Sequence, residues 1–396
     1  MTLHYNFPEN ITLDEVKDII KDNQNFILVD KGDYTVANYV RSGNDTHPPV
    51  VDRTTAILRE LRGLIFDSIT GRVISRRYQK FFNFGEREDV TEIDVSRDHI
   101  ILTKLDGSMI TPFRTSNGNL YWGTKMGVTD VSMQVDKFLI GRNNYIEFAN
   151  LCIDNDLTPI FEWISNEQRI VLDYPVSNLV LVAIRHNYNG SYLPYESVGI
   201  NAMRHSIEHI QSYYIKRLNS DNPNYSFDIN KFLNEIKSLE NAEGVVIRFN
   251  TGHMMKLKSD WYVSLHRAKS LLENERDVVG IILDNGEDDL YGLLTDNDKF
   301  RLGQFADGVW GDIFHFVNNV NTHYESTKGM SRKEFAFNIE ILSPSFRAMC
   351  FSGFEQQKIE VDDVVKYIRR KLGSNKTYDQ IRDIIKIKWK EIKLDE

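Results

Sequence analysis

The sequence predicts an α+β fold in which an antiparallel, strand-rich domain is followed by an all-helical domain. From Phe26 to about Lys258, short apolar runs are separated by turns rich in Gly, Asn, Asp and Ser, which is the pattern of strands joined by tight connections. After Trp261 the apolar residues recur at helical spacing, and no convincing strand alternation is visible. We therefore expect two domains, 1–265 and 266–396.

Capping signals and periodicity place the elements in order. Thr12 and Glu15 belong to a capping box at the start of a first helix, whose apolar residues share one face. Strands are predicted at Phe26–Val29, Tyr34–Val40, Gly63–Phe66, Arg72–Ser75, His99–Lys104, Met109–Arg114, Leu120–Met126, Thr158–Ile164, Leu179–His186, Val245–Phe249 and Met254–Lys258. Further helices are predicted near Met133–Ile140, Tyr145–Cys152, Ala202–Lys216, Ile229–Leu239, Val263–Glu273, Val361–Leu372 and Tyr378–Ile392.

Composition narrows the class of protein. Hydrophobic residues make up 41% and charged residues 27% of the 396 residues, as in ordinary soluble globular proteins. The two cysteines, Cys152 and Cys350, form neither a disulfide framework nor a zinc pattern. Neither a signal peptide nor a membrane-spanning run is visible. We expect a cytoplasmic protein in a reducing compartment, with no membrane partner.

The formal net charge of −9 argues against a bulk nucleic-acid binder. The charge is uneven, however, because acids dominate residues 271–300 and Lys and Arg dominate residues 366–393. The field that attracts a ligand is local, so a groove can still attract phosphates. The basic segment is compatible both with a grip on RNA and with the solvated side of a helix.

Lys104 ends an apolar run and is followed by a turn at Asp106-Gly107. A lysine delivered by a strand into a tight turn can be held rigidly and stripped of water. Such an amine can lose its proton and attack an electrophile. A surface lysine at a hairpin turn explains the same short string.

Several other strings put charged groups at the ends or edges of apolar strands. They are Leu61-Arg62-Gly63, Gln79-Lys80-Phe81-Phe82, Phe161-Glu162-Trp163, Glu243-Gly244-Val245 and Lys256-Leu257-Lys258. Residues two apart in a strand face the same side, so Lys256 and Lys258 point together. Taken singly, each string is compatible with an ordinary turn or a solvated sheet edge.

Together, and in this order, these strings resemble motifs of the covalent nucleotidyltransferases, the superfamily of polynucleotide ligases and RNA capping enzymes. The run from Lys256 to His266, with Arg62-Gly63 and Asn166–Val171, is similar to the phage RNA ligase 1 family, typified by the tRNA-repair ligase of T-even phages. The resemblance implies an antiparallel-sheet nucleotidyltransferase (ATP-grasp-like ligase) domain. It also implies that the helical C-terminal domain governs the choice of RNA substrate.

The resemblance implies an ATP-dependent RNA ligase that joins a 5′-phosphate to a 3′-hydroxyl in three steps. Lys104 attacks the α-phosphate of ATP and becomes lysyl-AMP, and the AMP then moves to the RNA 5′-phosphate. The 3′-hydroxyl finally attacks this activated phosphate and releases AMP. Each step develops negative charge on oxygens, so catalysis consists mostly of positioning and electrostatic stabilisation.

The family motifs also assign roles to individual residues. Lys256 and Lys258 would contact the α-phosphate, and Glu243 would support a divalent metal, Mg²⁺ or Mn²⁺. Other positions expected to contact the nucleotide are Arg62 and Lys80 at phosphates, Phe82 at the adenine, Glu162 at the ribose, and Gly107, Lys125, Gly244 and Tyr262 around the pocket.

Asp288 and Asp289 resemble an acidic pair of the family that can hold a hydrated divalent ion. The surrounding run of acids is equally compatible with a solvated helix face.

The partners implied by the resemblance are single-stranded RNA ends, with a broken tRNA anticodon loop as the expected substrate. Functional coupling to an end-healing polynucleotide kinase/phosphatase is also implied, and we expect a monomer. Two alternatives remain open at this stage. One is a DNA ligase or a GTP-using capping enzyme, and the other is a non-catalytic RNA-binding or phage assembly protein that retains the fold.

Overall fold

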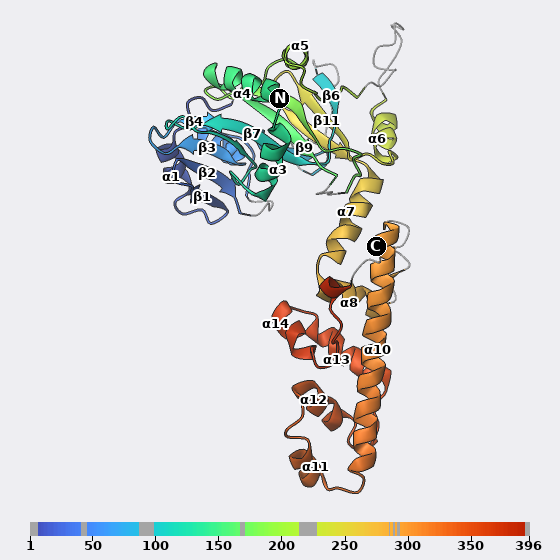
Figure 1. The fold of residues 1–396 in the computed structure, drawn as a ribbon. Coiled ribbons are helices and arrows are strands. Elements are labelled where there is room, and N and C mark those ends of the chain that lie inside the picture. Colours follow the sequence, from blue (N-terminus) through green and yellow to red (C-terminus); the bar gives the residue numbers. More distant parts are fainter. Residues whose placement is uncertain are drawn as a thin grey trace. The chain divides into compact units, whose positions relative to one another are not determined.

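A computed structural model describes residues 7–40, 46–86, 99–166, 171–213, 228–284, 286–287, 290 and 294–392. The chain divides into two compact units, Met1–Val263 and Ser264–Glu396 (Figure 1). The first unit mixes sheets with helices, and the described part of the second unit is helical. The predicted α+β fold with C-terminal helices is therefore confirmed.

The described part of the first unit contains three four-stranded sheets. The first sheet has the order β1-β2-β3-β4, with β1 (Phe26–Asp30), β2 (Tyr34–Tyr39), β3 (Leu64–Asp67) and β4 (Val73–Ser75). The second has the order β10-β9-β7-β8, with β7 (Ser108–Arg114), β8 (Leu120–Gly123), β9 (Leu157–Ile164) and β10 (Asn178–His186). The third has the order β5-β12-β11-β6, with β5 (Phe82–Asn83), β6 (His99–Thr103), β11 (Gly244–Phe249) and β12 (Met254–Lys258).

Helices cover these sheets. They are α1 (Leu13–Ile20), α2 (Arg53–Glu60), α3 (Asp130–Leu139), α4 (Asn143–Asp154), α5 (Tyr195–Arg204) and α6 (Ile229–Lys237). The predicted cap of α1 is confirmed, because the Thr12 hydroxyl accepts a hydrogen bond from the Glu15 amide.

The segment that follows α5 differs from the prediction. A helix was expected over Ala202–Lys216, but α5 ends at Arg204 and the chain continues in extended form through the bridges of His209 and Ser212. Ser206 has a positive φ of 52°, which stops the helix, and the following residues bond to β10 and β6 instead.

The second and third sheets meet where β6 gives way to β7. β6 pairs with β11 in the third sheet, whereas β7 pairs with β9 in the second. The linker from Lys104 to Gly107 therefore crosses from one sheet to the other. Leu102, Ile160 and Val182 pack together between the two sheets. This crossing positions the candidate site described below.

A buried ion network joins α2 to two other parts of the first unit. One is the segment that follows β4, and the other is β10. Glu60 bonds Arg76 at 3.0 Å and Arg185 at 2.7 Å, and all three side chains are at most 1% exposed. Burial raises the pKa of Glu60, but the two guanidinium groups outweigh it and the pKa is lowered overall. Arg76 also donates to backbone carbonyls, including that of Pro8, so the network is well supplied with partners.

The second unit surrounds a long helix, α10 (Asp296–Ser326). The helix α7 (Asp260–Leu272) leads into this unit from the first. The other helices are α8 (Glu275–Leu283), α11 (Arg332–Asn338), α12 (Pro344–Ser352), α13 (Val361–Lys371) and α14 (Asn375–Tyr378). One continuous apolar cluster joins α8, α10, α12 and α13.

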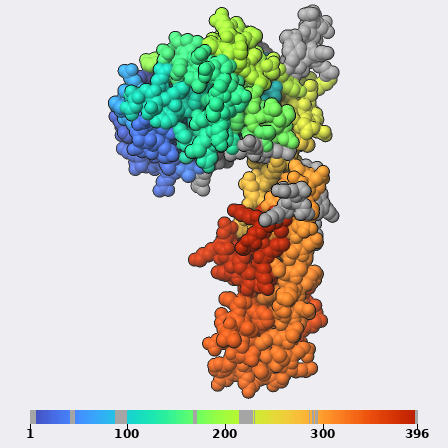
Figure 2. All heavy atoms as spheres, in the orientation of Figure 1, coloured from blue at the N-terminus to red at the C-terminus, as the bar shows by residue number. Residues whose placement is uncertain are grey.

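The predicted helix Tyr378–Ile392 is wrong in form, although its apolar stripe is buried. α14 is followed by short 3₁₀ turns at Asp379–Ile381 and Trp389–Glu391. The amides of Lys386 and Ile387 donate to Asp312 on α10, which removes them from a helical ladder. The red C-terminal residues therefore lie directly on the orange α10 (Figure 2).

No helix in the described part of the chain combines the length and the apolar character that a membrane span needs.

Replacing Glu60 by Gln should lower the stability of the first unit by about 3–5 kcal/mol, because it leaves two buried guanidinium groups without their counter-charge. Urea unfolding monitored by circular dichroism measures the change. The control is Asp154→Asn, which removes a 2.7 Å bond to Arg114 at a site where the Asp side chain is 60% exposed. This control should cost less than about 1 kcal/mol. Equal effects of the two substitutions would contradict the role given to the network.

Candidate active site

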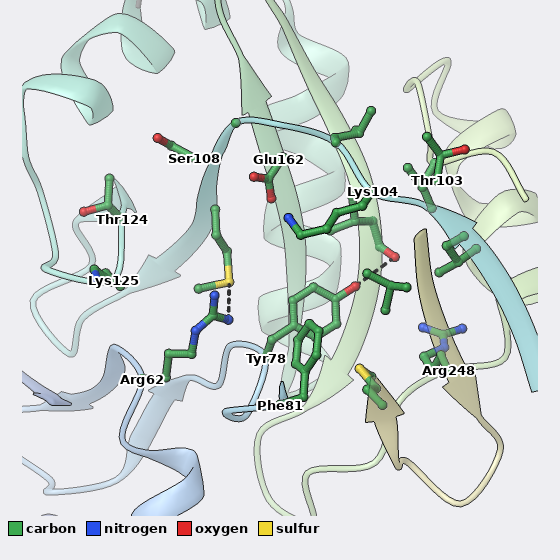
Figure 3. Close-up of a pocket in the computed structure, with 18 of the residues that line it drawn as sticks. Arg62, Tyr78, Phe81, Thr103, Lys104, Ser108, Thr124, Lys125, Glu162 and Arg248 are labelled. Atoms are coloured by element: carbon green, nitrogen blue, oxygen red, sulfur yellow. Dashed lines mark hydrogen bonds between the residues drawn. The ribbon is translucent and has the colours of Figure 1, made fainter. Parts of the chain in front are cut away.

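A cavity of about 470 Å³ lies where the second and third sheets meet (Figure 3). Its cations are Arg62, Lys104, Lys125 and Arg248, and Glu162 is its carboxylate. Apolar and aromatic side chains form the rest of the wall, among them Tyr78, Phe81, Leu102, Val182, Ile210, Val246 and Met254. The cavity therefore combines an apolar slot with an excess of positive charge, which suits a ligand with a flat apolar part and several negative charges.

Lys104 is held at the centre of the site by Glu243. Its Nζ donates to Glu243 Oε2 at 2.7 Å, and the Glu243 side chain is only 3% exposed. Lys258 Nζ lies 3.0 Å from the other oxygen, Oε1. The Lys104 amide also donates to the Gly244 carbonyl at 2.9 Å. One buried carboxylate just before β11 thus fixes two lysines from the strands on either side of β11, Lys104 after β6 and Lys258 at the end of β12.

Two glycines allow this approach. Gly244 has φ +136°, and a Cβ placed on it would lie 2.0 Å from the Leu257 carbonyl oxygen. A Cβ on Gly107 would lie 2.3 Å from the Trp163 carbonyl oxygen. Any larger residue would push apart β11 and β12 in the first case, and the turn and β9 in the second.

Asp106 anchors the turn that carries Lys104. One carboxylate oxygen accepts a hydrogen bond from the Tyr262 hydroxyl at 2.7 Å. The other accepts the amides of Val171 and Leu172, both at 2.7 Å. Asp106 was not predicted as a site residue in its own right, although it lies in the turn predicted after Lys104. Its contacts give Tyr262 a positioning role rather than a place in the cavity wall.

Lys256 is a largely buried cation beside the cavity. It pairs with Val246 in register, and its Nζ lies 5.6 Å from the centre of the Phe81 ring. Burial lowers the pKa of Lys256 to about 7, and the nearby charges of Arg62 and Lys104 lower it in the same direction. Lys256 has no ion-pair partner in the part of the chain that the structure describes, and a desolvated lysine of this kind gains from the approach of a phosphate.

Glu162 and Glu243 together form the acidic part of the site. Burial raises the pKa of Glu162 to about 7, Lys104 opposes the shift, and the charge of Glu243 adds to it. Carboxylates that repel one another in this way can accept a shared divalent cation, and Mg²⁺ binds with one or two carboxylates while keeping several waters. Among the described residues, no group of three or more metal-ligating side chains is assembled. Glu162 and Glu243 are two carboxylates, the number with which a largely hydrated Mg²⁺ is compatible.

Tyr39 stands among cations that sequence reasoning did not connect with it. Lys80 Nζ and Lys125 Nζ lie 5.3 and 5.1 Å from its ring centre. Burial raises the pKa of Tyr39, but Lys125, Arg62 and Lys80 outweigh that effect and lower it. The sequence around Tyr39 does not indicate that cations surround it, because those cations come from segments distant in the chain.

The structure brings together most of the predicted site residues, and it redistributes one role. Arg62, Lys104, Gly107, Lys125 and Glu162 line the cavity. The predicted residues that lie next to it, in the same cluster of side chains, are Lys80, Glu243, Gly244, Lys256, Lys258 and Tyr262.

Phe82 is not in the cavity wall. It is 4% exposed and packs in an apolar core with Ile101, Val245 and Met255. Its neighbour Phe81, which directly precedes the short strand β5, lines the cavity instead. Phe81 and Tyr78 are therefore the aromatic side chains of the cavity wall. Asp288 and Asp289 lie outside the described residues.

Comparison with known proteins gives a consistent result. A family model described as RNA ligase matches residues 60–262. A protein of Thermovibrio ammonificans, named provisionally as an RNA ligase, is 29% identical over 320 residues and covers 77% of each chain. RNA ligase 1 of bacteriophage TS2126 is 24% identical over 272 residues, 64% of each chain.

Two further matches differ more in length or in structure. A protein of Autographa californica nuclear polyhedrosis virus, named provisionally as a bifunctional polynucleotide kinase/RNA ligase, is 25% identical over 388 residues. That match covers 89% of this chain but 49% of the viral protein, so the chain spans about half its length. Among solved structures, an archaeal ATP-dependent RNA ligase has a TM-score of 0.45 and 12% identity, over 66% of this chain and 68% of that one.

The affinity of this site for a small anion should fall as the pH rises from 6 to 8. Lys256 loses its positive charge and Glu162 gains a negative one as each passes its pKa of about 7. Sulfate is a suitable probe because its own charge is constant in this range, and equilibrium dialysis with labelled sulfate measures the affinity. Lys256→Met should flatten part of the profile, and Lys256→Met with Glu162→Gln most of it. An unchanged slope in the double variant would show that other groups control the site.

Proposed function

This chain belongs to the RNA ligase family, and we propose that it joins a 5′-phosphate to a 3′-hydroxyl of RNA in an ATP-dependent reaction. The family match over residues 60–262 confirms the prediction of a ligase. The observation that carries the proposed mechanism is the place of Lys104, whose amine stands in the cavity between a carboxylate and an excess of cations.

In the proposed first step, Lys104 Nζ attacks the α-phosphorus of ATP. An N–P bond forms, the bond between the α-phosphorus and its bridging oxygen breaks, and pyrophosphate leaves while the amine's protons pass to solvent. In the second step an oxygen of the RNA 5′-phosphate displaces Lys104 from that phosphorus. In the third, the RNA 3′-hydroxyl attacks the activated 5′-phosphate and AMP leaves. Dividing the reaction in this way replaces a poor leaving group by good ones.

Different cations of the site are assigned to different phosphate groups of ATP. Arg62 and Lys125 lie on one side in Figure 3, and Lys80 joins them around Tyr39. Pyrophosphate carries the most negative charge of any product, so we assign it to these residues. Lys258 shares Glu243 with Lys104, and the charge of Lys104 acts on Lys256, so we assign these two lysines to the α-phosphate. A divalent ion held by Glu162 and Glu243 would offset further phosphate charge.

The adenine is assigned to the apolar slot. Phe81, Val182 and Val246 offer flat and branched apolar surfaces there, and Tyr78 donates to the Val182 carbonyl at 3.3 Å, which stiffens the wall. Stacking and burial of a base in such a slot favour a purine over a smaller ligand.

We propose single-stranded RNA ends as the substrate, in a repair reaction. The resemblance to tRNA-repair ligases suggests a broken tRNA anticodon loop and a role for the helical unit in selecting it. The provisional name of the viral relative places a polynucleotide kinase and a ligase in one polypeptide. Coupling of this chain to an end-healing kinase/phosphatase is proposed on the same ground. The absence of a β-module in the described residues 264–392 favours RNA ligation over DNA ligation or capping.

Incubation with ATP labelled at the α-phosphate and Mg²⁺ should label the protein, and Lys104→Ala should abolish the label. A phosphoramidate is stable to alkali and labile to acid, which identifies the linkage. The matched control is Lys137→Ala, which removes an exposed lysine of α3. Labelling from GTP alone would favour a capping enzyme, and absence of label from either nucleotide would favour a binding protein.

Lys104→Ala should still seal RNA that already carries AMP on its 5′-phosphate, because only the first two steps need the amine. Circularisation of such an RNA, resolved on a denaturing gel, measures this step. The same variant should fail on RNA with an ordinary 5′-phosphate. Normal sealing of ordinary 5′-phosphate ends by Lys104→Ala would refute the lysyl-AMP mechanism.

A further inference from the structure

Arg77 is a fully buried cation that the reaction as described does not use. Its exposure is 2%, and it follows Arg76 in the segment between β4 and β5. Its guanidinium donates to the Gly63 carbonyl through Nη1 and to the Gly123 carbonyl, at 2.8 Å, through Nη2. Within the described residues these two backbone carbonyls are its hydrogen-bond acceptors, and its Nε has none.

The two carbonyls belong to the segments that carry two cavity cations. Gly63 directly follows Arg62, and Gly123 ends β8 two residues before Lys125. These segments touch, since a Cβ on Gly63 would lie 2.6 Å from the Lys125 Cα. Lys125 is further held in a turn closed by reciprocal hydrogen bonds between Thr124 and Gly127. The backbone at both cations is therefore fixed by one side chain.

A charge buried in this way needs an explanation. Burial without a carboxylate costs several kcal/mol, and a backbone carbonyl is a weaker partner than an anion. Burial lowers the pKa of Arg77 to about 9, so the group is still charged at neutral pH. Arg62 lies near enough to act in the same direction. A neutral donor would satisfy each carbonyl at a smaller desolvation cost. The feature that only arginine supplies is its planar guanidinium, which reaches both carbonyls at once.

We propose that Arg77 is a positioning residue for the polyphosphate of the nucleotide: it ties the Gly63 and Gly123 carbonyls together and so holds Arg62 and Lys125 at the spacing that the phosphates require. This inference rests on the proposed function, because it presumes that a nucleoside triphosphate occupies the cavity. Arg77 itself is not among the residues that line the cavity.

The anchorage of Arg77 supports this role. Arg185 donates to the Arg77 carbonyl, and Arg185 is itself paired with Glu60 at 2.7 Å. A rigid ion network thus fixes the backbone of the residue whose side chain fixes the two cation-bearing segments. Small displacements of charged groups weaken phosphate binding strongly, because close charge-assisted hydrogen bonds depend on geometry.

The test measures binding of two ligands that differ in the phosphates. The α,β-methylene analogue of ATP cannot transfer AMP and reports on the whole cavity, whereas adenosine reports on the apolar slot alone. In Arg77→Met the dissociation constant of the analogue should rise about tenfold, which corresponds to the loss of one well-placed contact. The dissociation constant of adenosine should stay within about twofold of the wild-type value.

Positioning is separated from a general structural effect by a second comparison. If Arg77 acts through Arg62 and Lys125, the rise caused by Arg77→Met should shrink in Arg62→Ala and in Lys125→Ala proteins. Arg77→Lys keeps the charge but loses the planar fork, so it should also weaken the analogue. This conservative variant carries the comparison if circular dichroism shows that Arg77→Met does not fold.

Three results would overturn the inference. They are wild-type affinity for the analogue in Arg77→Lys and Arg77→Met, an equal loss of adenosine binding, and full additivity with both alanine variants. A wild-type protein that binds neither ligand and takes no label from ATP would instead contradict the proposed function.

Discussion

The site depends on one buried carboxylate. Glu243 is 3% exposed, and each of its oxygens is paired with a different lysine, Lys104 at 2.7 Å and Lys258 at 3.0 Å. A buried carboxylate must be compensated, so the three groups determine each other's positions. The turn after β6, the start of β11 and the end of β12 meet at this point. If Lys104 attacks an electrophile as proposed, Lys258 would still compensate Glu243.

Around this centre the cavity carries more positive than negative charge. Among the described residues, Arg62, Lys125 and Lys256 make no ion pair like the one between Lys104 and Glu243, and burial together with the neighbouring cations lowers the pKa of Lys256 to about 7. Desolvated cations that lack a paired anion are unfavourable, so an anionic ligand would offset that cost on binding. The unpaired state therefore contributes to affinity for a ligand with several negative charges.

The sequence predicts what depends on short spacing. Turn-bounded strands, the cap at Thr12 and the lysine pair of β12 are local patterns, and the structure reproduces them. It does not reveal which of Phe81 and Phe82 lines the cavity, because Phe81 lies outside the two-residue strand β5 and no strand alternation relates the two rings. The prediction of a helix at Tyr378–Ile392 was wrong for a related reason. A buried apolar stripe is compatible both with a helix and with turns whose amides donate to Asp312. The sequence does not identify Asp106 and Arg77 as site residues, because their hydrogen-bond partners lie between 14 and 156 residues away in the chain.

The charged groups of the first unit fall into two kinds with different consequences. The arginines of the Glu60 network and Arg77 are buried and bond backbone carbonyls or a buried carboxylate, so their positions are fixed by the fold. Lys256 and Glu162 have pKa values of about 7 and lie at the candidate site, so their charge can change near neutral pH. In the proposed reaction a triphosphate would become an adenylate and then a free nucleotide, and the charge of the bound ligand would change at each step. Buried arginines outside the cavity would then preserve the spacing of the phosphate-binding cations, while the titratable groups at the site would limit the cost of each change in charge.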